Sequence, residues 1–312
     1  MSAGRGAITL AHRLEYGALR AVIGALQSMS WERAASVGSA IGGIGYSPLR
    51  VRRTVAEKQI AAAFPDLSRH DVARIARASY EHLGRTTIET ALLSTLGREQ
   101  VLDLFDGAEG WEAVEGGLAQ GRGLILVTGH LGNWELGGAY IAARGIGLDA
   151  VARRMANPLF DTYLTRTRQR LGMAVVHDAD AVRRTPRSLR DGRAVAFVSD
   201  QGVLGLASTF VPFFGRPAKT PRGPAVFALR LGVPVVFGCA LRQPGGKYRI
   251  AFEPVPVVDT GDRERDVDTT VAAYTAALER WVRRAPEQYF WQHRRWRRQP
   301  ASTPADLRDP TR

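Results

Sequence analysis

The sequence predicts an α/β fold: a mostly parallel β-sheet with crossover helices, preceded by an N-terminal helical region. From Gly123 onward, short continuous apolar runs alternate with segments in which apolar residues recur at helical spacing. A strand that is buried on both faces is apolar throughout, so this alternation is typical of parallel strands joined by helices. Residues 1–100 show only the helical pattern, and their composition marks no separate β-rich unit.

The N-terminal region, residues 1–100, is predicted to associate with a membrane through an interfacial helix. In residues 14–31, Glu15 and Arg20 alternate with apolar residues at helical spacing, and a tryptophan stands at the end. A helix packed on its own domain shows the same pattern, and the residues alone do not decide between the two. A longer helix is expected at 72–96, after a turn with an N-cap.

The N-terminal segment lacks the features of a signal peptide and of a long membrane span. Residues 1–10 contain no sustained apolar core that leads to a small-residue cleavage site. The uncharged stretch 21–31 is shorter than the roughly 20 apolar residues that cross a bilayer, and the stretch 34–49 is glycine-rich and also short. The expected attachment is therefore peripheral or monotopic, or a single N-terminal anchor.

Residues 101–298 are predicted to form the α/β core, and residues 299–312, rich in Pro, Ser, Thr and charge, to be a disordered tail. The expected strands are 124–128, 148–152, 174–176, 194–199, 234–241 and 247–254. The expected helices are 134–143, 158–171, 182–190, 222–231 and 266–284. The last strand follows the turn sequence Pro244-Gly245-Gly246, so it is expected to complete a hairpin at the sheet edge.

Charge and cysteine content limit the partners that this chain is expected to have. The formal net charge of +13 favours an anionic partner, such as nucleic acid, anionic lipid or an acidic carrier protein. No nucleic-acid-binding motif accompanies the basic run 293–298, which favours a solvated or lipid-facing helix end and no nucleic-acid partner. The single cysteine, Cys239, excludes an intrachain disulfide and is expected to be a buried apolar residue.

Several catalytic classes lack their sequence motifs in this chain. There is no Gly-x-Ser-x-Gly nucleophile elbow and no Walker A loop. The six histidines are scattered and the cysteine has no mate, so neither a metal site nor a cofactor is expected.

The segment Thr128-Gly129-His130-Leu131-Gly132-Asn133-Trp134-Glu135 is the strongest candidate for a site. It follows a buried strand and begins a helix, so its polar groups are expected at the carboxyl end of the sheet, where α/β proteins bind ligands. A neutral imidazole suits the removal of a hydroxyl proton, and a carboxylate fixes its tautomer. His130 is the candidate general base and Glu135 its orienting carboxylate. The alternative is a structural histidine whose hydrogen bonds are internal.

This segment resembles the His-x4-Asp/Glu signature of glycerolipid-type acyltransferases, in the form GHLGNWE of the lipid A biosynthesis late acyltransferases. Further blocks are similar to that family in the same order along the chain. They are Ala63-Phe64-Pro65, the Arg-x3-Asn-Pro segment within 152–159, Ser199-Asp200-Gln201, the block 210–220 and the closing motif 286–296. The resemblance covers roughly residues 10–298.

The resemblance implies transfer of a fatty acyl chain from a thioester, usually on acyl carrier protein and alternatively on coenzyme A. The acceptor would be a hydroxyl of a lipid A precursor, a phosphorylated glycolipid, at the cytoplasmic face of the inner membrane. The acceptor hydroxyl would attack directly, so no serine or cysteine nucleophile is needed. Two alternatives stay open. One is an acyltransferase for another envelope lipid: a phosphatidylinositol mannoside, a lysophospholipid or an ornithine-type lipid. The other is a catalytically dead scaffold on the membrane.

Carried over by position, the family's site residues add substrate-binding candidates to the pair at His130. Arg153 would hold a phosphate or the developing oxyanion, although Arg154 makes the assignment ambiguous by one position. Asp200 ends a predicted buried strand, where it would either take part in site chemistry or cap the next turn. Asn133 would either cap the following helix or contact substrate.

Overall fold

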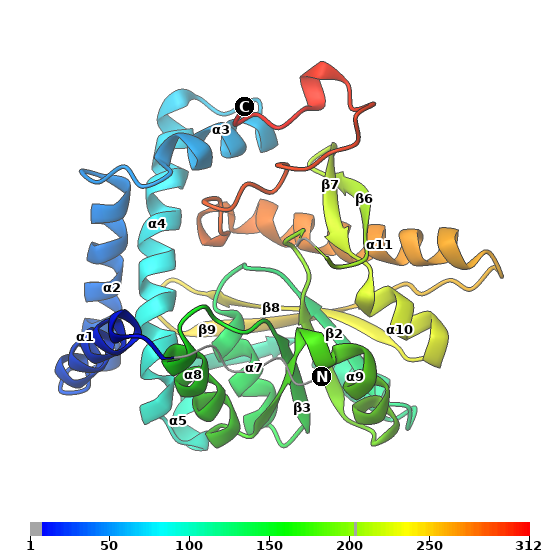
Figure 1. Ribbon diagram of the computed structural model, residues 1–312, viewed down its shortest axis with the longest axis horizontal. Helices are drawn as coiled ribbons and strands as arrows, with labels where there is room; N and C mark the ends of the chain where they lie inside the picture. The colour runs from blue at the N-terminus through cyan, green and yellow to red at the C-terminus, as the bar shows by residue number, and fades with distance from the viewer. Residues whose placement is uncertain (1–7, 203–204) are drawn as a thin grey trace.

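The computed structural model describes residues 8–202 and 205–312, and in this part of the chain a central sheet has helices on both faces (Figure 1). The helices are α1 (Leu10–Leu26), α2 (Trp31–Tyr46), α3 (Arg53–Ala63), α4 (Arg69–Leu92), α5 (Arg98–Asp103), α6 (Trp111–Leu118), α7 (Trp134–Ala143), α8 (Pro158–Arg170), α9 (Ala181–Arg190), α10 (Gly223–Leu231) and α11 (Arg263–Arg284). The strands are β1 (Phe105–Glu109), β2 (Leu124–Thr128), β3 (Leu148–Ala152), β4 (Met173–His177), β5 (Ala194–Val198), β6 (Ser208–Phe213), β7 (Arg216–Pro221), β8 (Val235–Arg242) and β9 (Tyr248–Val255).

The N-terminal region is helical, as predicted, and α1 to α4 lie beside the sheet at the left of Figure 1. The helix expected over 14–31 corresponds to α1, which begins four residues earlier, whereas Trp31 is the first residue of α2. Helix α1 ends at Leu26, and the side chain of Ser30 accepts a hydrogen bond from the backbone N–H of Arg33 to cap α2. A capping serine satisfies an N–H that the first turn of a helix leaves free, so the chain restarts a helix here with a new direction.

The main sheet has the strand order β1-β9-β8-β2-β5-β3-β4 within the described residues. Strands β8 and β9 form the predicted antiparallel hairpin, and the other five pairings are parallel. The hairpin is not at the edge, because β1 pairs with the outer side of β9. Strand β1 was not predicted, since an edge strand with polar residues such as Asp106 and Glu109 lacks the apolar run of a buried strand.

The two faces of the sheet are buried in two separate apolar clusters. Alternate side chains of a strand point to opposite faces. Ile125 and Val127 of β2 therefore belong to the cluster with α10 and α11, whereas Leu124 and Leu126 belong to the cluster with α7. All four side chains are buried. As the sequence indicated, β2 is apolar throughout because helices cover both faces of the strand.

The C-terminal segment packs on the protein instead of forming the disordered tail that its composition predicts. Asp309 is buried and forms an ion pair with Arg294 at 2.5 Å, and Arg216 of β7 donates hydrogen bonds to the carbonyls of Asp306 and Arg308. The basic run 293–298 is likewise part of the fold and not a solvated helix end. Its member Arg295 is buried and donates to the hairpin β6–β7. Ion pairs and charge-assisted hydrogen bonds thus hold in place a C-terminal segment whose polar composition predicts disorder.

Candidate active site

The loop between β2 and α7 places His130 at the carboxyl end of the sheet. Three backbone hydrogen bonds hold this loop: the carbonyl of His130 accepts from Phe290, and the N–H groups of Gly132 and Asn133 donate to Gln288 and Ala240. Gly132 has a φ of 62°, and a Cβ there would lie 2.0 Å from the carbonyl oxygen of Ala240. Only glycine fits this position, so the Gly in the motif follows from the close approach of the loop to β8.

Asp200, at the end of β5, holds His130 by two hydrogen bonds. The ring Nδ1 of His130 lies 2.7 Å from Oδ1 of Asp200, and the backbone N–H of His130 donates to Oδ2 at 2.9 Å. Because Nδ1 faces a carboxylate, it carries the proton, and Nε2 is the ring nitrogen with a lone pair. The side-chain amide nitrogen of Gln201 lies 3.5 Å from Nε2. The expectation that Glu135 orients His130 is not met, because the carboxylate that contacts Nδ1 of His130 is that of Asp200.

Burial and charge act in opposite directions on this pair. Burial lowers the pKa of His130, but the negative charge and hydrogen bond of Asp200, with the charge of Glu135, outweigh it and raise the pKa above 6.5. Burial raises the pKa of Asp200, yet its contacts with His130 bring it down to about 2. Asp200 therefore stays ionised at neutral pH and stabilises an imidazolium on His130, as expected of the carboxylate beside a general base.

Glu135 forms a buried ion pair with Arg168 of α8 instead. Nε of Arg168 donates to Oε2 of Glu135 at 2.9 Å, and a second guanidinium nitrogen lies 2.5 Å from Oε1. Burial lowers the pKa of Arg168, but the charge and hydrogen bonds of Glu135 raise it overall. No local pattern in the sequence points to Arg168, because it contacts a residue of another helix that is 33 positions away in the chain.

A cavity of about 560 Å³ includes His130 in its wall, and its polar lining includes Glu135, Arg153, Arg168, Gln201 and Arg230. Its apolar lining comes from several elements: Trp134 of α7, Val151 of β3, Leu164 of α8, Phe197 of β5, and Val226 and Phe227 of α10. A mostly apolar cavity with a few convergent polar groups is the usual form of a small-molecule site. The cavity can therefore take an amphipathic molecule with its reacting group at His130.

The two arginines that the sequence left ambiguous occupy different places. Arg153 lines the cavity, whereas Arg154 lies 3.8 Å from the carboxylate of Asp161 and is not part of the cavity wall. Arg153 is thus the one of the two that a bound phosphate or oxyanion can reach.

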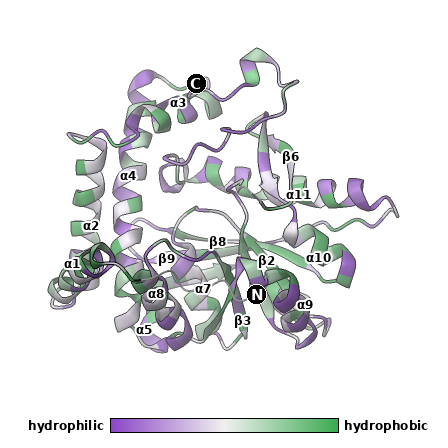
Figure 2. Cartoon of the chain, in the orientation of Figure 1, coloured by the Kyte–Doolittle hydropathy of each residue, from purple (hydrophilic) through white to green (hydrophobic). Residues whose placement is uncertain are grey.

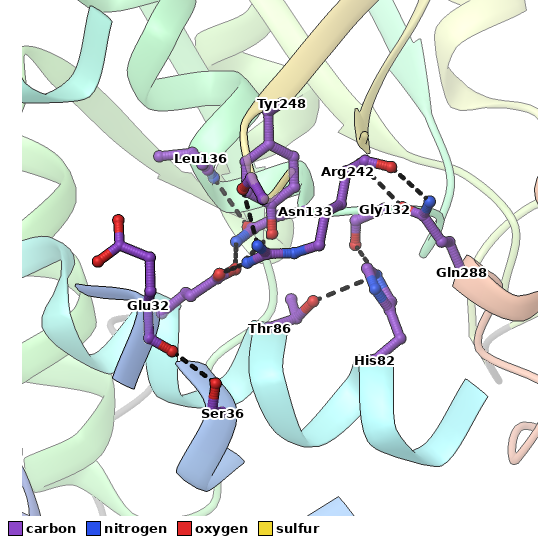
Figure 3. A network of polar contacts seen from close by, with 12 residues as sticks. Glu32, Ser36, His82, Thr86, Gly132, Asn133, Leu136, Arg242, Tyr248 and Gln288 are labelled. Atoms are coloured by element: carbon purple, nitrogen blue, oxygen red, sulfur yellow. Dashed lines mark hydrogen bonds and ion pairs between the residues drawn. The ribbon is translucent and has the colours of Figure 1, made fainter. Parts of the chain in front are cut away.

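Asn133 caps α7 and does not line the cavity. Its side-chain oxygen accepts from the N–H of Leu136, and its amide donates to the carboxylate of Glu89 on α4 at 2.9 Å (Figure 3). Glu89 is only 1% exposed and is also bound by Tyr248 and Arg242. Of the two sequence readings, helix capping is the one that the structure shows.

Comparison with known proteins agrees with this geometry. Residues 14–298 match the family described as bacterial lipid A biosynthesis acyltransferase. The chain is 26% identical to the lipid A biosynthesis lauroyltransferase of Escherichia coli (strain K12), over 86% of this chain and 87% of that protein. It is 28% identical to the lipid A biosynthesis palmitoleoyltransferase of the same strain, over 85% of each chain. It is also 28% identical to the phosphatidylinositol mannoside acyltransferase of Mycobacterium tuberculosis (strain CDC 1551 / Oshkosh), over 64% of this chain and 62% of that protein.

Proposed function

The chain belongs to the bacterial lipid A biosynthesis acyltransferase family, and from this premise we propose that His130 acts as the general base that activates an acceptor hydroxyl for acyl transfer. The observation that carries the proposal is the pair of His130 and Asp200, whose histidine lines a cavity with both polar and apolar residues in its wall. This arrangement matches a reaction in which a polar hydroxyl meets the carbonyl of a long apolar chain.

In the proposed reaction, Nε2 of His130 takes the proton of the acceptor hydroxyl as its oxygen attacks the thioester carbonyl. Asp200 holds the ring by Nδ1 and stabilises the imidazolium. The tetrahedral oxyanion then collapses, the C–S bond breaks, and the leaving thiolate receives the proton from His130. The product is an ester, and the enzyme returns to its starting state. Arg153, Arg168 and Arg230 line the cavity, and each is a cation that could face the oxyanion or a phosphate of the acceptor.

We assign the acceptor to the lipid A precursors, which are phosphorylated glycolipids, and the donor to acyl carrier protein. The family match and the two relatives from Escherichia coli support the acceptor. The net charge of +13 supports an acidic carrier protein as donor, because opposite charge speeds the encounter. A mannosylated inositol lipid is the second candidate acceptor, since a relative named for that substrate matches at 28% identity. The dead-scaffold alternative is disfavoured by the intact hydrogen-bonded pair of His130 and Asp200.

Attachment to the cytoplasmic face of the inner membrane is proposed to occur through α1, α2 and the turn after them. Exposed large apolar side chains gather there, and hydrophobic residues recur along both helices in Figure 2. They are Ile8, Leu10, Leu14, Val22, Met29, Val37, Ile41, Ile44, Leu49 and Val51. Such a surface is typical of a protein that contacts a membrane or a partner. In the described part of the chain, the helices are too short or too polar to cross a bilayer.

The test is a transfer assay with purified protein in detergent micelles, with products identified by mass spectrometry. Acyl carrier protein and coenzyme A thioesters are each offered to a phosphorylated glucosamine lipid, a mannosylated inositol lipid and a lysophospholipid. We expect transfer from acyl carrier protein to the glucosamine lipid, and added salt should raise the apparent KM for that donor. Transfer only to another acceptor would overturn the acceptor assignment, and folded protein without transfer to any acceptor would overturn the proposed activity.

A further inference from the structure

A groove of about 450 Å³ lies between α2 and α4, apart from the active site, with which it shares no lining residue among those described. It runs alongside a close helix contact. Gly38 and Gly42 of α2 meet Gly84 of α4 so tightly that a Cβ on Gly42 would lie 2.0 Å from the carbonyl oxygen of Tyr80. Small residues let the two backbones touch, and the residues next to this contact, including Ala40, leave the groove open.

The groove has the chemistry of an anion site. Three serines line it, Ser36, Ser39 and Ser47, and the hydroxyl of Ser36 donates to the backbone carbonyl of Glu32 at 2.7 Å. Two arginines from α4 also line it: Arg77, which pairs with Glu81 at 3.0 Å, and Arg85. Nε of Arg85 is buried and finds no hydrogen-bond partner within residues 8–202 and 205–312. A buried guanidinium nitrogen without an acceptor is costly, and an anion bound in the groove would place a negative charge beside this guanidinium.

Ion pairs within the chain engage other charged residues near Arg85. Its neighbour Arg242 is also a cation: burial lowers the pKa of Arg242, and the charge of Arg85 lowers it further. The nearby buried carboxylate of Glu89 is already bound by Arg242. The carboxylate in the groove, Glu81, accepts from Arg77. The charged residues that line the groove are Arg77, Arg85 and Glu81, a net charge of +1, and Glu32 at the start of α2 is a further carboxylate close to Arg242. The wall of the groove therefore attracts an anion.

We propose that this groove binds the phosphate headgroup of an anionic glycerophospholipid. Exposed apolar side chains flank it on α2: Val37, Ile41 and, on the groove wall itself, Ile44. A lipid fits both features, because its phosphate would meet Arg85 and the serines while its acyl chains lie in the bilayer beside these apolar residues. An acidic protein would supply a carboxylate to Arg85 but would leave the exposed apolar residues beside the groove without an apolar partner. The site rests on the proposed membrane attachment, but not on the acceptor or on the chemistry of His130.

The first experiment uses a soluble lipid, so that binding is measured without a membrane. Monomeric dihexanoyl phosphatidylglycerol is titrated into the full chain by calorimetry, in parallel with dihexanoyl phosphatidylcholine, glycerol 3-phosphate and inorganic phosphate. We expect saturable binding of the anionic lipid alone. Arg85→Gln should weaken it about fivefold or more, the effect of one basic residue at an anionic headgroup. Ala40→Trp should block the groove without a change of charge, and Arg187→Gln on the exposed face of α9 should have no effect.

The second experiment compares vesicles of phosphatidylcholine with and without phosphatidylglycerol, by co-sedimentation. The variants Arg85→Gln and Ala40→Trp should lose the preference for the anionic vesicles while their circular dichroism and melting temperature match those of the wild type. A preference that survives in both variants would refute the site, as would equal affinity for inorganic phosphate and lipid. If Arg85→Gln loses affinity for acyl carrier protein and keeps its lipid binding, the groove is a protein dock and the proposal fails. Acyl transfer to micellar acceptor is assayed separately, so failure of the catalytic proposal is recognised on its own.

Discussion

Replacement of Asp200 by Asn tests the central pair with an almost unchanged shape. Asp200 now accepts two hydrogen bonds, from Nδ1 of His130 at 2.7 Å and from its backbone N–H at 2.9 Å. In Asp200→Asn, the amide oxygen still accepts from the backbone, so the NH₂ group faces Nδ1 and needs a lone pair there. The imidazole then carries its proton on Nε2 and cannot accept from the hydroxyl. We expect the transfer step to slow by about 10²–10⁴-fold, or roughly 3–5 kcal/mol of barrier.

The same substitution makes a separate prediction about pH. His130 must be neutral to act as a base, so the wild-type rate should fall as pH drops through its pKa, which Asp200 and Glu135 raise above 6.5 against the effect of burial. Without the Asp200 charge, burial pulls the pKa down, and the residual activity of the variant should persist to lower pH. Because the pKa of His130 is raised in the folded protein, His130 also stabilises the fold at low pH, and this stabilisation disappears as pH rises through that pKa. Asp200→Asn should remove most of this stabilisation.

The assay is single-turnover transfer from acyl carrier protein across a pH series, so that the chemical step is measured and product release is not. Asp149→Asn is the matched control. Asp149 is a buried carboxylate on β3 that binds Arg193 and Ser188, away from His130. It should change stability but not the acidic limb of the rate profile. A rate for Asp200→Asn within a few-fold of wild type, or an unchanged acidic limb in a folded protein, would refute the roles assigned to the pair.

Three further predictions concern other parts of the protein. His130→Ala should lower single-turnover transfer by about 10²–10⁴-fold in a protein that still folds by circular dichroism, and near-normal transfer would exclude it as the base. Glu135→Gln should leave Arg168 buried without its counter-charge, so the free energy of unfolding, measured in urea, should fall by about 3–5 kcal/mol. A loss well below 1 kcal/mol would show that the ion pair does not hold α7 to α8. Deletion of residues 1–31 should weaken co-sedimentation with anionic vesicles, and equal sedimentation would place the membrane contact elsewhere.

The sequence predicted the strands and helices of the core well, because the residue pattern that produces each element lies within the element itself. Continuous apolar runs such as 124–128 and 194–199 correspond to β2 and β5, since strands buried on both faces are recognisable without knowledge of their neighbours. The same local rule failed for the edge strand β1, whose residues are half exposed, and for the hairpin β6–β7, which forms a separate small sheet. Composition predicted the tail incorrectly, because its order depends on the pairing of Asp309 with Arg294.

For the site, the sequence alone determined which residue types stand at the ends of the central strands: His130 after β2 and Asp200 after β5, which are neighbouring parallel strands. Only the tertiary structure decided which carboxylate holds the imidazole, because Glu135 and Asp200 have the same chemistry and differ in direction. The carboxylate of Glu135 binds Arg168 on another helix, and the carboxylate of Asp200 binds His130 at the edge of the sheet. Spacing along a chain limits which side chains can meet, but pairing across 33 or 70 residues depends on how the helices and strands pack against one another.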